Sequence, residues 1–249
     1  MVARRRLDAE LVHRGLTATR TQALQLIAES RVLVNGAVAA KPAHLVAAAD
    51  NVVVVGPPPR FVSRGGEKLD AALDHFAVDV SGQRLLDCGA STGGFTDCLL
   101  QRGALAVVAL DVGHGQLHPR IRDDERVTVL ERTNIRAATA EVIGGRVDGA
   151  VADVSFISLT AVIPVLTMLC KPRSSMVLLV KPQFEAGRAV VSRGKGVVTD
   201  PMVHTEVRAL IDETLAGAGC LVHGWMESPI RGGEGNREFL VHATTGNAR

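Results

Sequence analysis

Four ionisable residues stand where apolar runs of the sequence meet polar turns. VDGAVAD closes on Asp153 and MVLLVK closes on Lys181, while Lys68 and Glu238 occupy similar junctions far away in the chain. The carboxyl ends of strands in a parallel sheet open onto the crevice where such sheets bind ligands. Carboxylates and amines gathered in a crevice are suited to general acid–base chemistry. We therefore expect Lys68, Asp153, Lys181 and Glu238 to form one assembled catalytic site.

A glycine-rich turn lies between the first two of these residues. RLLDCGASTGGFT is typical of a strand, a turn and the start of a helix, and glycines let the backbone approach a ligand closely. Asp111 ends the next strand about 20 residues later, where a carboxylate commonly binds the hydroxyls of a ribose. The turn departs from GxGxxG, so it is a weak signal alone. Together with Asp111 it predicts a pocket for a nucleoside-bearing cofactor rather than a purely structural turn.

The elements that must position these residues alternate along the chain. Strands are expected at residues 83–88, 104–110, 127–130, 147–153, 175–181, 220–226 and 238–242, and helices at 67–76, 94–102, 159–169 and 202–217. This alternation predicts a doubly wound α/β fold with a mostly parallel sheet covered on both faces. The turn-rich segment 229–236 predicts an antiparallel hairpin for the last two strands, at the edge of the sheet.

The first 60 residues have a different pattern. Helical spacing at 7–14 and 20–30 precedes RVLVNG, whose Asn35-Gly36 is a strong hairpin signal, and a further strand is expected at 51–55. Three consecutive prolines then favour a stiff, extended linker. We expect a small α+β domain at 1–56, a linker at 57–63 and the large domain at 64–249.

Charge is distributed unevenly over the 249 residues. Residues 1–70 hold ten Lys or Arg against six Asp or Glu, whereas the whole chain has a formal charge of only +2. The basic end favours a polyanionic partner, with a merely solvated terminus at Arg4, Arg5 and Arg6 as the alternative. The four cysteines form no CxxC pair and the histidines show no metal pattern, so no metal is expected. No signal peptide or membrane-spanning run is recognised, and we expect a cytoplasmic protein without a membrane partner.

Two resemblances to known families extend these expectations. LDxxLVxRGLxxTRxxAxxLIxxxxVxVNG, within residues 5–55, resembles the S-four-type RNA-binding domain. The alternative for this module is a small cap that only packs on the large domain. SRGGEKL, DCGASTGGFT, DVGHGQL, LERTNIR, DVSFISL, KPQFE and GNREF resemble, in order and over essentially the whole chain, the TlyA family of rRNA 2'-O-methyltransferases, which belongs to the FtsJ-like group.

The TlyA resemblance implies a class I S-adenosylmethionine-dependent methyltransferase fold, S-adenosyl-L-methionine as cofactor, and ribosomal RNA or ribosomal subunits as partner, with cytidine as the target nucleoside. The residues that would line the methionine part of the cofactor are Gly89, Ser91, Thr92, Gly93, Gly94 and Phe95. Asp111 would bind the ribose, and Thr133 with Asn134 would lie near the adenine. The implied cofactor site comprises Asp87, Gly89, Ser91, Thr92, Gly93, Gly94, Phe95, Asp111, Val112, Thr133, Asn134 and Asp153. The implied RNA contacts comprise Arg5, Arg6, Arg14, Arg20, Arg31 and Arg64.

The same resemblance maps a catalytic Lys/Asp/Lys/Glu set onto Lys68, Asp153, Lys181 and Glu238. Lys181 would contact a ribose 2'-hydroxyl, either as a neutral base or as an ammonium that stabilises the forming alkoxide, and Asp153 would hold it in place. Phe156 and Phe184 are candidates for stacking on a base turned out of a helix, against the alternative of core packing. Residues 187–199 are expected to form a basic loop that closes over substrate, or an ordinary surface excursion. The competing functions are a non-catalytic RNA-binding or ribosome-binding factor and, as a weaker alternative, a membrane-lytic haemolysin.

Overall fold

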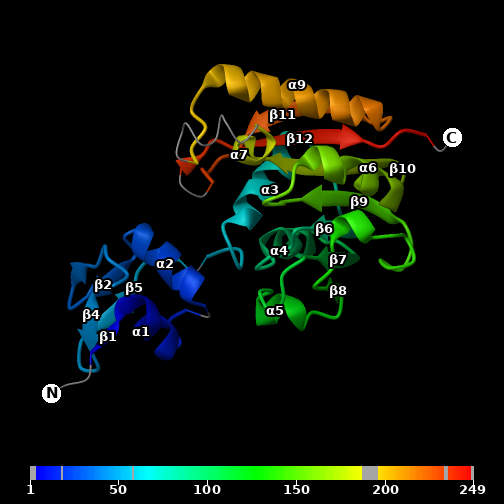
Figure 1. The fold of residues 1–249 in the computed structure, drawn as a ribbon. Helices are drawn as coiled ribbons and strands as arrows, with labels where there is room; N and C mark the ends of the chain where they lie inside the picture. The colour runs from blue at the N-terminus through cyan, green and yellow to red at the C-terminus, as the bar shows by residue number, and fades with distance from the viewer. Residues whose placement is uncertain (1–3, 18, 58, 187–195, 233–234, 248–249) are drawn as a thin grey trace. The chain divides into compact units, whose positions relative to one another are not determined.

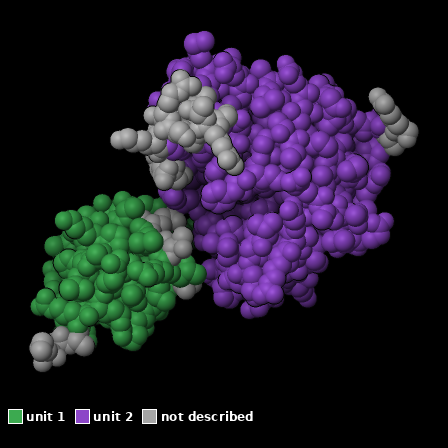
Figure 2. Space-filling view, in the orientation of Figure 1, with its two compact units in different colours: residues 1–60 green, residues 61–249 purple. Residues whose placement is uncertain are grey.

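The protein divides into two compact units in its computed structural model. The structure describes residues 4–17, 19–57, 59–186, 196–232 and 235–247, and most of the basic loop expected at 187–199 lies outside these ranges. Unit 1 comprises residues 1–60 and unit 2 residues 61–249, and the division falls within the linker expected at 57–63 (Figure 2). Each unit is described by itself.

Unit 1 combines two helices with two small sheets (Figure 1). The helices are α1 (Leu7–His13) and α2 (Arg20–Ala28), and the three-stranded antiparallel sheet has the order β3 (Ala37–Val38), β2 (Val32–Val34), β5 (Val52–Val54). Asn35 and Gly36 turn the β2–β3 hairpin with φ angles of 50° and 83°, the left-handed values that an Asn-Gly hairpin turn uses. The predicted hairpin is therefore confirmed. Leu7, Leu11 and Ile27, each at most 1% exposed, anchor the core of this unit.

One pair of strands in unit 1 was not expected. β1 (Arg4–Arg6) pairs antiparallel with β4 (Leu45–Ala47), so the three arginines belong to a strand. All three side chains are exposed, and no apolar alternation marks the segment as a strand. The pairing depends on a partner about 40 residues away, which a local pattern does not reveal.

Unit 2 is built on a seven-stranded sheet. Its order is β11-β12-β10-β9-β6-β7-β8, with bounds Leu221–Glu227, Phe239–Thr244, Cys170–Val180, Val147–Ala152, Arg84–Cys88, Ala106–Leu110 and Val127–Leu130. The five strands from β10 to β8 run parallel, whereas β12 is antiparallel to both β10 and β11. The predicted doubly wound sheet with an antiparallel edge hairpin is confirmed. β10 starts five residues earlier than expected, and its pairing with β9 is irregular between Cys170 and Ser175.

Helices cover both faces of this sheet (Figure 1). α3 (Gly65–His75) and α4 (Gly94–Gln101) share one core with strand residues such as Leu85 and Val107, while α6 (Leu159–Leu169) and α9 (Pro201–Gly217) share the other with Leu86 and Val108. Successive strand residues point to opposite faces, which explains the continuous apolar runs in the sequence. The described residues of unit 2 also form three short helices: α5 (Pro119–Arg122), η1 (Ile135–Ala137) and α7 (Pro182–Glu185).

Candidate active site

Two strand ends bring a lysine and an aspartate together. Asp153 follows β9 and Lys181 follows its neighbour β10, and Lys181 Nζ lies 2.5 Å from Asp153 Oδ1. This contact is an ion pair that lacks the angles of a hydrogen bond, because Asp153 Oδ1 has no hydrogen-bond partner among the described residues. Lys181 Nζ donates a hydrogen bond to Ser155 Oγ at 3.0 Å. Lys181 is only 9% exposed, so its ammonium depends on these oxygens rather than on bulk water.

A second ion pair lies at the adjoining strand end. Val180 pairs with Phe239, so the antiparallel register continues from Lys181 to Glu238 at the same edge of the sheet. The Glu238 carboxylate is bound by the ammonium of Lys68 from α3, and both residues are less than 10% exposed. Glu238 does not pair with Arg237, which instead contacts Glu227 at 3.5 Å. The four residues predicted to act together thus form two ion pairs near neighbouring strand ends, and the Lys68–Glu238 pair is the more deeply buried of the two.

The loop before Glu238 is built around a close approach of the backbone. A Cβ atom at Gly232 would overlap Glu238 Oε1, so the carboxylate occupies the space that a side chain at position 232 would need. Asn236, 2% exposed, keeps this loop in place: its main-chain carbonyl accepts from Gly232 N at 3.0 Å. Its amide side chain accepts from Val198 N at 2.9 Å and donates to Gly196 O at 3.0 Å. The position of Glu238 is therefore set by a loop that is itself anchored.

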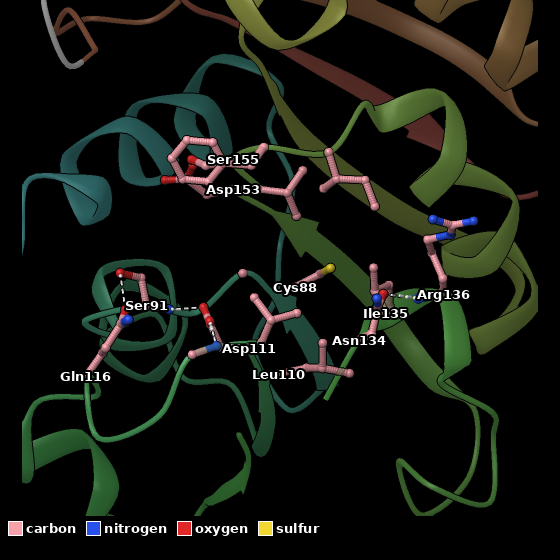
Figure 3. A pocket seen from close by; sticks show the side chains of 16 residues that line it. Cys88, Ser91, Leu110, Asp111, Gln116, Asn134, Ile135, Arg136, Asp153 and Ser155 are labelled. Carbon is pink, nitrogen blue, oxygen red and sulfur yellow. Dashed lines mark hydrogen bonds between the residues drawn. The ribbon is translucent and has the colours of Figure 1, made fainter. Parts of the chain in front are cut away.

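A cavity of about 570 Å³ opens beside the first ion pair (Figure 3). It has the size of typical cofactor sites. Asp153 and Ser155 lie on one side of it, across from Asp111 and Gln116 (Figure 3). Gly89 borders the cavity with φ 86°, and a Cβ at this position would lie 2.5 Å from the main-chain oxygen of Asp153. Only glycine lets these strand ends approach so closely.

Asp111 is oriented before any ligand binds. One carboxylate oxygen accepts from Ser91 N at 2.7 Å and the other from Gly113 N at 2.6 Å. Each oxygen retains a free lone pair, so a carboxylate held in this way can still accept from two hydroxyl groups. The arrangement fits the ribose of a nucleoside.

Asp87, in the strand β6 that leads into the glycine-rich turn, is fully buried. Burial raises the pKa of its carboxyl to about 7, and the nearby charge of Asp153 acts in the same direction. Thr96 Oγ1 donates to Asp87 Oδ2 at 2.6 Å, but Oδ1 has no hydrogen-bond partner among the described residues. An unpaired buried carboxylate oxygen is costly unless a donor reaches it. Asp87 does not border the cavity, so the features that fit a nucleoside cofactor are the close backbone approach at Gly89 and the carboxylate of Asp111.

Comparisons with known proteins identify the family. Residues 61–245 match the FtsJ-like methyltransferase family, and residues 5–52 match the S4 domain. The 16S/23S rRNA (cytidine-2'-O)-methyltransferase TlyA of Mycobacterium tuberculosis (strain ATCC 25618 / H37Rv) is 48% identical over 98% of this chain and 91% of its own length. This chain belongs to the TlyA family of FtsJ-like methyltransferases.

Two further relatives of this chain have a different name. Hemolysin A of Brachyspira hyodysenteriae is 39% identical over 95% of this chain and 98% of its own length. A solved structure from Streptococcus thermophilus, also named as a hemolysin, has a TM-score of 0.79 and 38% identity over 100% of this chain and 90% of that one. In this TlyA-family chain, none of the helices among the described residues is long and apolar enough to span a bilayer.

The cavity includes half of the cofactor residues expected in this TlyA-family methyltransferase. Gly89, Ser91, Asp111, Val112, Asn134 and Asp153 line it, whereas Asp87, Thr92, Gly93, Gly94, Phe95 and Thr133 do not. The side chain of Phe95 is 3% exposed and packs in the core shared with α3 and α4, so only its backbone can face a ligand. The cofactor roles of all twelve residues remain predictions.

Sequence reasoning missed several residues that line the cavity of the methyltransferase. All but one of them lie inside the recognised motifs, and they comprise Cys88, Leu110, Gly113, Gln116, Ile135, Arg136, Val154, Ser155 and Ile157. Gln116 belongs to DVGHGQL and Ser155 to DVSFISL, so a position inside a recognised motif was the available signal. No group of three or more His, Cys, Asp or Glu within the described ranges is placed to bind a metal ion.

Phe156 of the methyltransferase is 93% exposed and borders the cavity. Its φ angle of 65° is left-handed, a conformation that is costly for a bulky residue and concentrates at functional sites. The Phe156 and Phe184 rings lie 5.3 Å apart between centroids, and Lys181 Nζ is 5.9 Å from the centre of the Phe184 ring. The two phenylalanines therefore form an aromatic edge beside the lysine, and the core-packing alternative does not describe Phe156.

The arginines expected to contact RNA differ in the exposure of their side chains and in their partners within the protein. Buried Asp8 pairs with Arg6 and Arg20, and these guanidinium groups together hold the Asp8 pKa at about 2. Buried Glu10 likewise pairs with Arg5 and Arg14. The side chains of Arg5, Arg6 and Arg20 remain 48–59% exposed, whereas Arg14 is 22% exposed and also donates to the carbonyls of Ala47, Ala48 and Asp50.

Arg31 and Arg64 complete the predicted RNA contacts of the TlyA-family chain. Arg31 is 21% exposed, contacts Glu29 and donates to the carbonyls of Val55 and Pro57. Arg64 is exposed at the N-cap of α3. Arg14 and Arg31 thus have a structural task, which the sequence pattern did not indicate, and phosphate contact by all six arginines remains a prediction.

Proposed function

We propose that this protein transfers a methyl group from S-adenosyl-L-methionine to the 2'-hydroxyl of a cytidine in ribosomal RNA. The substrate class is taken from the names of the relatives, among them the 23S rRNA (cytidine-2'-O)-methyltransferase TlyA of Campylobacter jejuni at 35% identity over 73% of this chain. The observation that carries the proposal is the Lys181–Asp153 ion pair at the border of a nucleoside-sized cavity. A ribosomal substrate implies a cytoplasmic reaction.

The cavity residues would bind the methyl donor. Asp111 would accept from the ribose hydroxyls, the backbone at Gly89 would approach the methionine part, and Val112 with Ile135 would contact the adenine. The bound cofactor supplies a methyl group on a positively charged sulfur, which is already a good leaving group. The protein then has to align the accepting oxygen with that methyl group, and alignment accounts for much of the rate enhancement.

Lys181 would meet the 2'-hydroxyl. Asp153, 2.5 Å from Nζ, would hold the lysine in place, and the ammonium of Lys181 would donate to the oxygen as negative charge develops on it. The hydroxyl proton is released to solvent during the transfer. Lys68 and Glu238 would form the rigid edge of the site, because their ion pair is buried one strand away.

RNA would be bound by both units. In the S4 domain, the exposed guanidinium groups of Arg5, Arg6 and Arg20 suit contacts to phosphates, which position RNA without reading its sequence. In unit 2, Phe156 would stack on the target base after it turns out of its helix. A base placed there would bring its ribose close to Lys181, since Phe156 borders the same cavity as Ser155, the hydrogen-bond partner of the lysine.

The test compares two lysines of the same strand pair. Lys181→Ala should lower incorporation of labelled methyl into ribosomal subunits by about 10³-fold or more, because no other ammonium replaces it. S-adenosylmethionine binding, measured by calorimetry, should change little. Lys171→Ala is the matched control: Lys171 pairs with Asp148 at 2.5 Å at the opposite end of β10 and β9, and its loss should leave turnover intact.

Two outcomes would refute the proposal. Full activity of Lys181→Ala would remove the lysine from the mechanism. If the unaltered protein binds ribosomal RNA but incorporates no methyl, the chain is a non-catalytic RNA-binding factor instead.

A further inference from the structure

The hydroxyl of Ser155 is a polar group of the site to which the proposed mechanism gives no task. It lies two residues after Asp153, is exposed, and borders the cavity (Figure 3). Its oxygen accepts the 3.0 Å hydrogen bond from Lys181 Nζ. The hydroxyl therefore contacts the group that would meet the substrate, from the side of the cofactor cavity.

The donors of Lys181 can be counted. A lysine ammonium has three N–H groups and no acceptor. Ser155 Oγ accepts from one of them, Asp153 Oδ1 is an ion-pair partner 2.5 Å from Nζ, and the described residues offer Nζ no second hydrogen-bond acceptor. A long side chain with an ammonium end is free to rotate unless its partners fix it. The hydrogen bond to Ser155 and the attraction to Asp153 together limit the directions in which the remaining N–H groups point.

The backbone around Ser155 is itself restrained. Val154 is 8% exposed and belongs to the core beneath α6, and Phe156 is held at φ 65°. Ser158 then caps α6 by accepting from Thr160 N at 3.1 Å. The hydroxyl of Ser155 is thus carried on a short segment fixed at both ends, which suits it to hold another side chain in place.

We propose that Ser155 is a positioning residue for methyl transfer: its hydroxyl, with Asp153, directs a free N–H of Lys181 toward the accepting 2'-oxygen. The inference depends on the proposed function, because it needs Lys181 to meet that oxygen. A serine is suited to the task since it is neutral. A second carboxylate there would place negative charge beside an oxygen that is itself becoming negative, whereas a hydroxyl gives direction without charge.

The experiment uses the full-length protein, unmethylated ribosomal subunits and labelled S-adenosylmethionine. Ser155→Ala removes the acceptor, so kcat should fall by about 10²-fold, the effect expected of a misplaced catalytic group. KM for the subunits and Kd for S-adenosylmethionine should stay within about threefold of the original values, since binding contacts are unchanged. Ser155→Thr keeps the hydroxyl and should recover most of the lost kcat.

Ser81→Ala is the matched control. It removes an exposed hydroxyl in the turn before β6, at the opposite end of this strand from the cavity, so kcat should be retained.

Three results would overturn the inference. They are an unchanged kcat in Ser155→Ala, a loss that Ser155→Thr does not recover, and a loss in which Kd for S-adenosylmethionine rises as much as kcat falls. The last would show that the segment only shapes the cavity. The proposed function fails separately, if the unaltered protein transfers no methyl or Lys181→Ala keeps full activity.

Discussion

At the scale of single residues, burial distinguishes the site lysine from a lysine on the surface. Lys181 and the surface lysine Lys171 each form an ion pair of the same length with an aspartate. Their side chains differ in exposure, which is 11% for Lys181 and 55% for Lys171. Burial removes competing water and strengthens the electrostatic effect of the ammonium on a nearby oxygen. A chemical role thus depends on where along the strand the pair lies.

Gly232 gives the sharpest prediction at this scale. In Gly232→Ala the new methyl group would overlap Glu238 Oε1, so the carboxylate must move and its ion pair with Lys68 is disturbed. We expect kcat for methyl transfer to fall by about tenfold or more, because the edge of the site loses its rigidity. Cofactor affinity, measured by calorimetry, should be retained, since Gly232 does not border the cavity.

Gly217→Ala is the control for that substitution. Gly217 ends α9, and a Cβ there has no neighbour within 4 Å among the described residues, so activity should be unaffected. Equal activities of the two variants would show that Glu238 tolerates displacement.

At the scale of elements, the antiparallel β11–β12 hairpin places a buried histidine, His242, against the end of α3. His242 on β12 stacks on His223 of β11 with centroids 4.8 Å apart, and lies 5.5 Å from the ring of Phe76 at the end of α3. Burial, with a contribution from His223, lowers the His242 pKa to about 4. The folded protein therefore keeps this imidazole neutral where an unfolded chain would protonate it.

The free energy of unfolding should depend on pH because of this histidine. The unfolded pKa is about 6.5, so between pH 6.5 and about 4 the unfolded state binds more protons and the free energy of unfolding falls as the pH falls. Above pH 6.5 this contribution is constant. Urea unfolding at pH 7 and pH 5 measures it, and His242→Gln should reduce the difference between the two midpoints. The exposed His75→Gln serves as control, and an identical pH dependence in His242→Gln would contradict the assignment.

At the scale of the whole molecule, each unit has its own hydrophobic core. Unit 1 holds eight Lys or Arg against four Asp or Glu, whereas the cavity and both ion pairs belong to unit 2. Phe61 is 4% exposed and Val62 N donates to Asp97 Oδ2 at 2.8 Å, so the start of unit 2 is part of its core.

A fragment of residues 60–249 should therefore fold and bind S-adenosylmethionine with nearly the affinity of the full chain. Its kcat/KM for ribosomal subunits should fall by about tenfold or more, and its RNA affinity should depend less steeply on salt, because fewer phosphates are contacted. Binding titrations over a range of salt concentrations, together with methyl incorporation, measure both effects. A fragment as efficient as the full chain would show that unit 1 is dispensable.

Much of this molecule is determined by the sequence alone. The strands that carry Asp153 and Lys181 were predicted to within a residue at their carboxyl ends, because a buried parallel strand must be apolar on both faces and ends where polarity returns. The Asn35-Gly36 hairpin follows from local backbone preference. Local patterns of this kind identify the elements and the family motifs.

Only the tertiary structure decided how these parts meet. The pairing of Lys68 with Glu238, the contact between Lys181 and Ser155, and the space left by Gly232 join segments that are distant in the chain or set by loop geometry. The same holds for Arg14 and Arg31, which resemble RNA-binding arginines in sequence but hold backbone carbonyls in the fold. Side-chain partners depend on sheet order, register and burial together, and these are properties of the packed chain rather than of any short segment.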